Sequence, residues 1–186
     1  MQPAIFLDRD DTITIDSGYT YKVSDFVWKA GALDALRLFA QARLPLFIVT
    51  NQGGIARGLF TAPDMHAFHD HLQKEAEKFG VHFTDIAYCP HHPLAPDPAF
   101  PEGCNCRKPE PAMLTMLADK WQIDLASSVM IGDRETDLFA GRKAGCFAYF
   151  DQAPEAGRPT LLDQAHYILK THFPDRYHKW IDAQNG

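Results

Sequence analysis

Hydrophobic residues along the chain occur in two patterns, short continuous runs and longer stretches at helical spacing. The short runs end at polar or acidic residues, which is typical of buried strands whose carboxyl ends reach solvent. The longer stretches have one apolar face, as Met65, Phe68 and Leu72 show in the segment 61–80. The predicted strands are 4–7, 46–49, 81–90, 127–131, 146–150 and 165–169, and the predicted helices are 31–43, 61–80, 112–123, 138–145 and 174–184.

Strands and helices alternate from one end of the chain to the other. This order predicts an α/β fold, a Rossmann-like three-layer sandwich in which helices cover both faces of a mostly parallel sheet. The interval from the strand 4–7 to the helix 31–43, and the interval from Thr50 to Lys108, are too short for a large cap domain. We therefore expect residues 1–186 to form a single domain.

The composition limits the classes of function. The chain has a net charge of −6 and 46% hydrophobic residues, ordinary values for a globular domain. The acidic balance argues against a nucleic-acid-binding surface, and no apolar stretch is long enough to span a membrane. The N-terminal residues lack the basic region and apolar core of a signal peptide. We therefore expect a cytoplasmic monomer that binds neither nucleic acid nor membrane.

Acidic residues crowd at the end of the first predicted strand. Asp8 and Asp10 lie two positions apart, so both side chains can face one pocket from an extended segment, and Asp11 follows directly. Asp133 ends another predicted strand, and parallel strands place their carboxyl ends at one edge of a sheet. For Asp8 taken alone, a turn or cap is the better explanation. Together the carboxylates of Asp8, Asp10 and Asp133 would form a site with oxygen ligands only, which Mg²⁺ prefers.

Other residues suit phosphoryl transfer. Thr50 follows the strand 46–49, and the backbone N–H groups of residues 51–54 can form an anion nest. Lys108 stands beside Arg107 in the most compact basic pair of the chain. A carboxylate can attack phosphorus only if the repulsion between the two anions is offset. A divalent cation, Lys108 and the nest would offset it.

Four short motifs, in order along the chain, carry a family resemblance. DRDDT (8–12), VTN (49–51), RKP (107–109) and GDRETD (132–137) resemble the motifs of the haloacid dehalogenase superfamily of phosphatases. The resemblance implies that Asp8 is the nucleophile, which forms an aspartyl-phosphate, and that Asp10 is the general acid and then the base. It also implies that Mg²⁺ is held by the carboxylates of Asp8 and Asp133 and by the backbone carbonyl of Asp10. Thr50 and Lys108 would hold the transferring phosphoryl group.

Longer segments resemble one branch of this superfamily, which contains the heptose bisphosphate phosphatases and the histidinol-phosphate phosphatases. These segments are 16–28, 50–58, 89–93 and 104–114. The resemblance implies Mg²⁺-dependent removal of the C7 phosphate from a small heptose 1,7-bisphosphate. The substrate-contacting positions that it assigns are Asp16, Ser17, Gly18, Tyr19, Thr50, Asn51, Gln52, Gly53, Arg107, Lys108 and Arg134. Asp137, four residues after Asp133, would either support the metal indirectly or complement the dipole of a helix that begins there.

Three of the four cysteines lie in one proline-rich loop, residues 89–106. Cys89 and His91, then Cys104 and Cys106 after twelve intervening residues, supply three sulfurs and one imidazole. This is the ligand set of a closed, structural Zn²⁺ site, although free thiols and a bound iron stay open as alternatives. In the branch that the chain resembles, the same positions bind zinc. The ion would hold the loop and so position Arg107 and Lys108.

One position departs from that branch, in which the first motif reads Asp-x-Asp-Gly-Thr. Asp11 takes the place of the glycine, so we expect a turn that does not need a positive φ. The histidines His66, His69 and His71 fall on or beside the polar face of the helix 61–80 and are expected to be solvated.

Two alternatives to the heptose substrate stay open. The first is histidinol-phosphate phosphatase activity, although residues 18–21 and the long loop between His91 and Cys104 favour a heptose bisphosphate. The second is a catalytically silent, zinc-stabilised binding module. Loss of an acid at position 8 or 10 would have indicated it, and both acids are present.

Overall fold

The computed structural model of the chain describes residues 1–95, 97, 99, 103–151 and 159–185. A five-stranded sheet of order β3-β2-β1-β4-β5 forms its centre, and every strand pair is parallel. The strands are β1 (Ile5–Leu7), β2 (Leu46–Asn51), β3 (Phe83–Cys89), β4 (Val129–Gly132) and β5 (Phe147–Phe150). The helices are α1 (Ala32–Gln41), α2 (Ala62–Glu77), α3 (Ala112–Trp121), α4 (Glu135–Ala144), α5 (Leu161–His172) and α6 (Pro174–Asn185), with 3₁₀ turns at Val23–Asp25 and Leu125–Ser127.

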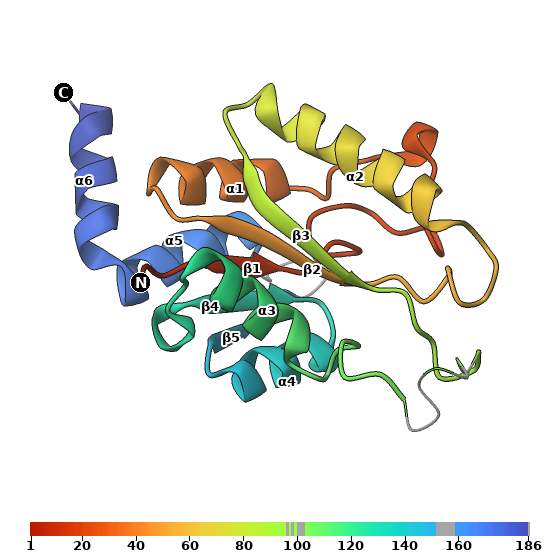
Figure 1. Ribbon diagram of the computed structural model, residues 1–186. Coiled ribbons are helices and arrows are strands. Elements are labelled where there is room, and N and C mark those ends of the chain that lie inside the picture. Colours follow the sequence, from red (N-terminus) through yellow and green to blue (C-terminus); the bar gives the residue numbers. More distant parts are fainter. Residues whose placement is uncertain (96, 98, 100–102, 152–158, 186) are drawn as a thin grey trace.

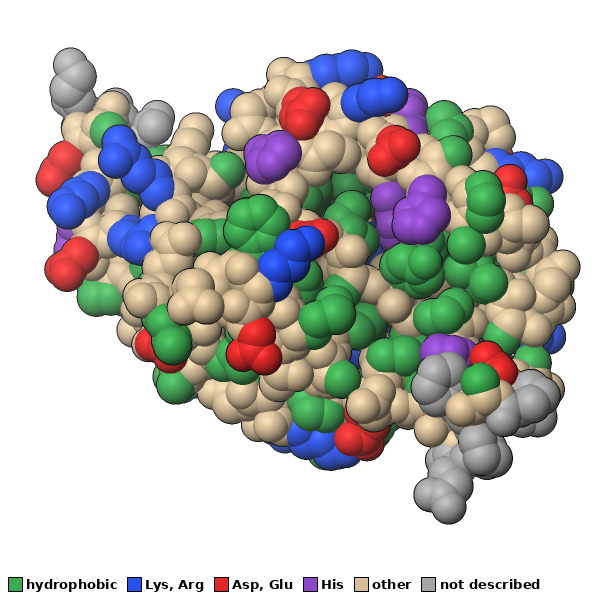
Figure 2. Space-filling model, in the orientation of Figure 1, with side chains coloured by type: hydrophobic (Ala, Val, Ile, Leu, Met, Phe, Trp, Pro, Cys, Tyr) green, Lys and Arg blue, Asp and Glu red, His purple; other side chains and the backbone are tan. Residues whose placement is uncertain are grey.

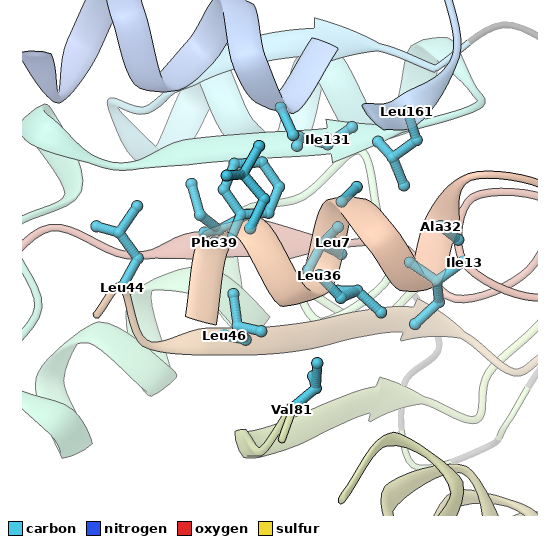
Figure 3. Packing of buried hydrophobic residues seen from close by; sticks show 14 of the residues in the cluster. Leu7, Ile13, Ala32, Leu36, Phe39, Leu44, Leu46, Val81, Ile131 and Leu161 are labelled. Carbon is cyan, nitrogen blue, oxygen red and sulfur yellow. The ribbon is translucent and has the colours of Figure 1, made fainter. Parts of the chain in front are cut away.

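Two apolar layers fill the space between the sheet and its helices. Alternate residues of a strand point to opposite faces, so Ile5 and Leu7 pack with α1, α2 and α5, whereas Phe6 packs with α3 and α4. Figure 3 shows the first layer, in which Leu36 and Phe39 of α1 lie over the strands. The result is the three-layer α/β sandwich that the sequence predicts.

Helix α2 begins where the sequence indicates. The Thr61 hydroxyl accepts a hydrogen bond from the backbone N–H of Asp64 at 3.3 Å, and the carboxylate of Asp64 accepts one from the N–H of Thr61 at 2.8 Å. This reciprocal pair satisfies N–H groups that a helix start leaves unpaired.

The predicted strand 165–169 is wrong, because this segment lies within α5. Thr160 and Asp163 form a second capping pair at the start of this helix, at 3.2 Å from the Asp163 N–H to the Thr160 hydroxyl. The buried residues Leu161, Ala165 and Ile168 recur at helical spacing over the whole segment, a pattern that the five-residue window was too short to reveal.

The strand order places the site at one end of the molecule. The chain leaves the central strand β1 toward β2 and β3 and then crosses to β4 on its other side, and such a reversal opens a crevice at the carboxyl ends of the strands. In Figure 1 these ends lie on the right with the long loop after β3, and α6 stands at the opposite end. Within the described residues, no helix is long and apolar enough to cross a membrane.

Candidate active site

A lysine and two buried aspartates meet at the carboxyl ends of the central strands. Lys108 Nζ lies 2.6 Å from Asp8 Oδ1 and 2.6 Å from Asp137 Oδ1, and it also donates to the carbonyl of Val49 at 2.7 Å. All three charged side chains are buried. Burial lowers the pKa of Lys108, but Asp8 and Asp137 together raise it above its ordinary value, so the ammonium is retained.

A third carboxylate completes an acidic cluster. Single oxygens of Asp8, Asp133 and Asp137 all lie within 4.8 Å of one another. Burial raises the pKa of Asp8 to about 7 and that of Asp133 to about 6, since ionised carboxylates are poorly solvated there. Asp133 Oδ1 is buried and accepts no hydrogen bond from any described residue. Three carboxylates this close together, one of which has a buried oxygen without a hydrogen bond, fit a divalent cation with oxygen ligands.

Asp137 is closer to the chemistry than the sequence indicated. Its Oδ2 accepts the backbone N–H of Arg134 at 3.0 Å, which caps α4, while its Oδ1 contacts Lys108. The side chain therefore caps the helix start and lies beside the acidic cluster, and its support of a metal stays a prediction. The direct contact with Lys108 was not foreseen, because the sequence does not show which residues a loop brings across the sheet.

The carboxylate of Asp10 is held by a buried arginine that sequence reasoning overlooked. Arg9 is fully buried, and its Nε and Nη2 donate to the two oxygens of Asp10 at 2.8 and 3.0 Å. The expected solvation of His69 is wrong, since it is 5% exposed and its Nε2 lies 3.0 Å from Arg9 Nη1. His66 is exposed and His71 is half-buried, so the expectation is confirmed for His66. The sequence did contain a signal that Arg9 is paired, because it closely follows a predicted buried strand, where a charged residue needs partners.

Residues after β2 brace the motif that carries Lys108. The Asn51 side chain donates to the carbonyl of Lys108 at 3.1 Å and accepts its N–H at 3.0 Å. Gln52 Nε2 donates to the hydroxyl of the buried Thr50 at 2.8 Å and to Asp10 at 2.8 Å. These contacts bring together the first three motifs, which lie far apart in the sequence.

Asp11 adopts a positive φ of 57°, so the expectation of a turn without one is wrong. Aspartate tolerates the left-handed region better than most residues because its short side chain bonds the local backbone. Here Asp11 Oδ1 accepts the N–H of Asp16 at 3.0 Å, and the Asp11 N–H donates to Thr14 at 2.8 Å. The carboxylate thus reproduces a conformation for which the family motif uses glycine.

The predicted substrate residues mostly line one open cavity of about 940 Å³. Asp16 accepts the N–H groups of Gly18 and Thr20 at 3.1 and 2.8 Å, which holds the loop after the first motif at the rim. Ser17 is the one predicted contact that is not among the lining residues. The walls include Asp8, Tyr19, Gly53, His92, Arg107 and Arg134.

The four predicted zinc ligands form a second cluster at the edge of this cavity. Cys89 Sγ lies 3.5 Å from Cys104 Sγ and 3.0 Å from Cys106 Sγ, and His91 Nδ1 lies 3.3 Å from Cys106 Sγ. None of the three cysteines is in a disulfide. A tetrahedral ion with bonds of about 2.3 Å needs ligand atoms about 3.8 Å apart, so this donor set fits Zn²⁺ after a small expansion. His91 Nε2 lies 3.8 Å from Oδ2 of Asp97, beyond hydrogen-bond distance.

Similarity to known proteins agrees with the site. Residues 105–150 match the sequence model of a family described as HAD-hydrolase-like, so the class is a hydrolase with the haloacid dehalogenase fold. A solved heptose 1,7-bisphosphate phosphatase from B. bronchiseptica, complexed with magnesium and phosphate, is 30% identical with a TM-score of 0.77, over 91% of this chain and 99% of that one.

Related protein sequences identify one family within this class of hydrolases. The D-glycero-beta-D-manno-heptose-1,7-bisphosphate 7-phosphatase of Yersinia pestis is 40% identical over 142 residues, 76% of either chain. A D-glycero-alpha-D-manno-heptose-1,7-bisphosphate 7-phosphatase of Photorhabdus laumondii is 34% identical over 167 residues, 88% of either chain. The chain belongs to this family of heptose-1,7-bisphosphate 7-phosphatases. It is therefore a phosphatase, and the alternative of a silent binding module is not favoured.

Proposed function

We propose that this phosphatase removes the C7 phosphate of D-glycero-D-manno-heptose 1,7-bisphosphate through an aspartyl-phosphate on Asp8. A carboxylate oxygen of Asp8 attacks phosphorus, the bond from phosphorus to O7 breaks, and Asp10 protonates the departing alkoxide. Asp10 then takes a proton from water, whose oxygen attacks the aspartyl-phosphate. Inorganic phosphate leaves and the Asp8 carboxylate is regenerated.

The observation that carries this proposal is the acidic cluster with Lys108 at its centre. Under the proposal, the carboxylates of Asp8 and Asp133 and the backbone carbonyl of Asp10 hold Mg²⁺. The ion would neutralise charge on the phosphoryl group and on its attacking carboxylate. Lys108 and Thr50 hold the phosphoryl oxygens, and Lys108 changes partner from Asp8 to phosphate when the substrate binds. Asp137 keeps the ammonium in place during this exchange.

The cavity suits a small sugar with a second phosphate. Under the proposal, the remaining cavity-lining residues contact the sugar and the distal group, with Arg107 and Arg134 facing its charge. Arg107 Nη1 donates a hydrogen bond to the carbonyl of His91 at 2.8 Å, so the proposed zinc site would fix this side chain.

We further propose that the protein is a single-domain, cytoplasmic monomer without nucleic-acid partners. On the face in Figure 2, basic and acidic side chains of the described residues are interspersed.

A substrate panel tests the proposed function. We expect phosphate release from heptose 1,7-bisphosphate to exceed that from histidinol phosphate by at least about tenfold in kcat/KM, since a pocket built for polar substrate groups rejects analogues that lack them. Both anomers belong in the panel, because relatives are named for each. EDTA should stop the reaction and Mg²⁺ should restore it. Preference for histidinol phosphate would overturn the assignment of the substrate.

Removal of one thiolate tests the proposed zinc site. We expect the purified protein to contain about one zinc per chain, and Cys106→Ser to lose it, because a hydroxyl is a poor zinc ligand. kcat/KM should fall as well, since Arg107 and Lys108 follow the lost ligand directly. Cys146→Ser is the matched control, as Cys146 is buried outside the cluster and should leave the zinc content unchanged. Full zinc in Cys106→Ser, measured by elemental analysis, would contradict the ligand assignment.

A further inference from the structure

Arg9 uses its whole guanidinium group inside the protein. Nε and Nη2 bond the two oxygens of Asp10, and Nη2 also donates to the carbonyl of Thr20 at 2.9 Å and to Oε1 of Gln52 at 3.1 Å. Nη1 bonds Nε2 of His69 at 3.0 Å. A side chain with this many partners and no exposed surface has one available position.

The carboxylate that Arg9 holds is the one that must reach the substrate. Asp10 lines the cavity, and its side chain is 17% exposed, whereas that of Arg9 is 1% exposed. A forked pair of hydrogen bonds fixes both the position and the plane of a carboxylate, which a single bond does not. Gln52, the residue that follows β2, adds a third bond to Asp10. The carboxylate is therefore presented to the cavity in one orientation.

Helix α2 supplies the support on the far side of Arg9. Arginine can only donate, so His69 Nε2 must accept, which requires a neutral imidazole. Burial, together with Arg9 and His66, lowers the pKa of His69 to about 3, in agreement with a neutral ring. The ring of Phe68, the preceding residue of the helix, lies under the guanidinium with 4.7 Å between Arg9 Cζ and its centroid. This helix therefore seats the arginine by hydrogen bonding and by stacking.

We propose that Arg9 is a positioning residue, seated by His69 of α2, which aims the Asp10 carboxylate at the leaving-group oxygen of the substrate. The inference rests on the proposed function, because it needs Asp10 to protonate that oxygen. A misaimed Asp10 slows phosphoryl transfer from substrates whose leaving group needs a proton. Transfer from an aryl phosphate, whose phenolate leaves without one, should be spared.

Two leaving groups and two variants of His69 provide the test. In His69→Leu, Arg9 loses an acceptor, and we expect kcat/KM for heptose 1,7-bisphosphate to fall about tenfold or more, part of the 10²–10⁴-fold that acid–base catalysis typically supplies. For p-nitrophenyl phosphate, kcat/KM should stay within about twofold of wild type, because it reports only the steps up to formation of the phosphoenzyme. His69→Gln keeps an acceptor for Nη1 and should restore the sugar-phosphate rate.

Leu72→Ala controls for lost stability, since Leu72 is a buried residue of the same helix that packs in the apolar layer. It should destabilise the protein and leave the ratio of the two kcat/KM values unchanged. Equal losses on both substrates in His69→Leu, or no loss on either, would overturn the inference. If His69→Leu does not fold, Arg9→Lys replaces it, because lysine keeps the charge without the fork and should show the same selective loss.

Failure of the proposed function would look different. A wild-type protein that ignores heptose bisphosphate but hydrolyses another alkyl phosphate refutes the substrate. The same comparison of alkyl with aryl phosphate then still tests the role of Arg9.

Discussion

Asp8→Asn should lower phosphate release by on the order of 10⁴-fold or more, the scale on which loss of a covalent nucleophile acts in other hydrolases. The amide cannot form the acyl-phosphate, although its size is nearly that of the carboxylate. The fold should survive, because Lys108 keeps Asp137 at 2.6 Å. Burial already makes the ionised form of Asp8 unfavourable, with a pKa of about 7, so a neutral amide removes a desolvation cost. Steady-state kinetics and thermal unfolding measure the two effects.

Asp85→Asn provides the control for this variant. Asp85 is also paired with a lysine, Lys120 at 2.7 Å, but it lies on β3 and is not among the cavity-lining residues. The activity of the Asp85→Asn variant should remain within about twofold of wild type, because an ion pair near the surface contributes little to stability. Wild-type turnover by Asp8→Asn would end the proposal of covalent catalysis by this residue.

Gly132→Ala should disable the site by a steric route. A Cβ at Gly132 would lie 2.3 Å from Cβ and 2.4 Å from Cγ of Asp137, so the aspartate would have to leave its position. Lys108 would lose one of its two carboxylates, and breaking a buried charge pair typically costs on the order of 3 kcal/mol. We expect kcat/KM per folded molecule to fall by on the order of 10²-fold, the loss seen when one electrostatic group is removed from an active site.

Gly141→Ala separates the loss of packing from the loss of the site. Gly141 lies on α4, and a Cβ there would lie 2.6 Å from Cβ of Met130, in the core and not beside Asp137. This variant should be destabilised as well, but its folded fraction should turn over substrate at close to the wild-type rate. If both alanine variants have the same activity per folded molecule, Asp137 is not needed to hold Lys108.

The predictable part of the fold lay in patterns that extend over a whole element. The strand β1 was recognisable because buried strands are continuously apolar. Helix α2 was recognisable because Thr61 and Asp64 form a capping pair at its start. Helix α5 was missed because five apolar-rich residues have no period of their own. The clustering of Cys89, His91, Cys104 and Cys106 was predictable too, because these residue types stand close together in the sequence.

The part of the site that the sequence concealed depends on contacts across the sheet. Arg9 looked like an ordinary charged neighbour of two aspartates, and only the folded chain brings His69 to it. Asp11 adopts a positive φ against expectation, because its side chain bonds the local backbone and stabilises a conformation that glycine normally adopts. Asp137 reaches Lys108 over a distance in sequence that no spacing rule covers.

The hydrogen bond from the Asp8 N–H to the carbonyl of Ile131, at 2.9 Å, ties the two acid-bearing strand ends together. Their separation is thus set by the ladder spacing of a parallel sheet, about 4.8 Å, and not by any loop. The spacing of the two acids is consequently a property of the sheet. A substitution at the exposed Gly18 or Tyr19, in the loop at the rim of the cavity, should therefore leave the distance between the Asp8 and Asp133 strand ends unchanged.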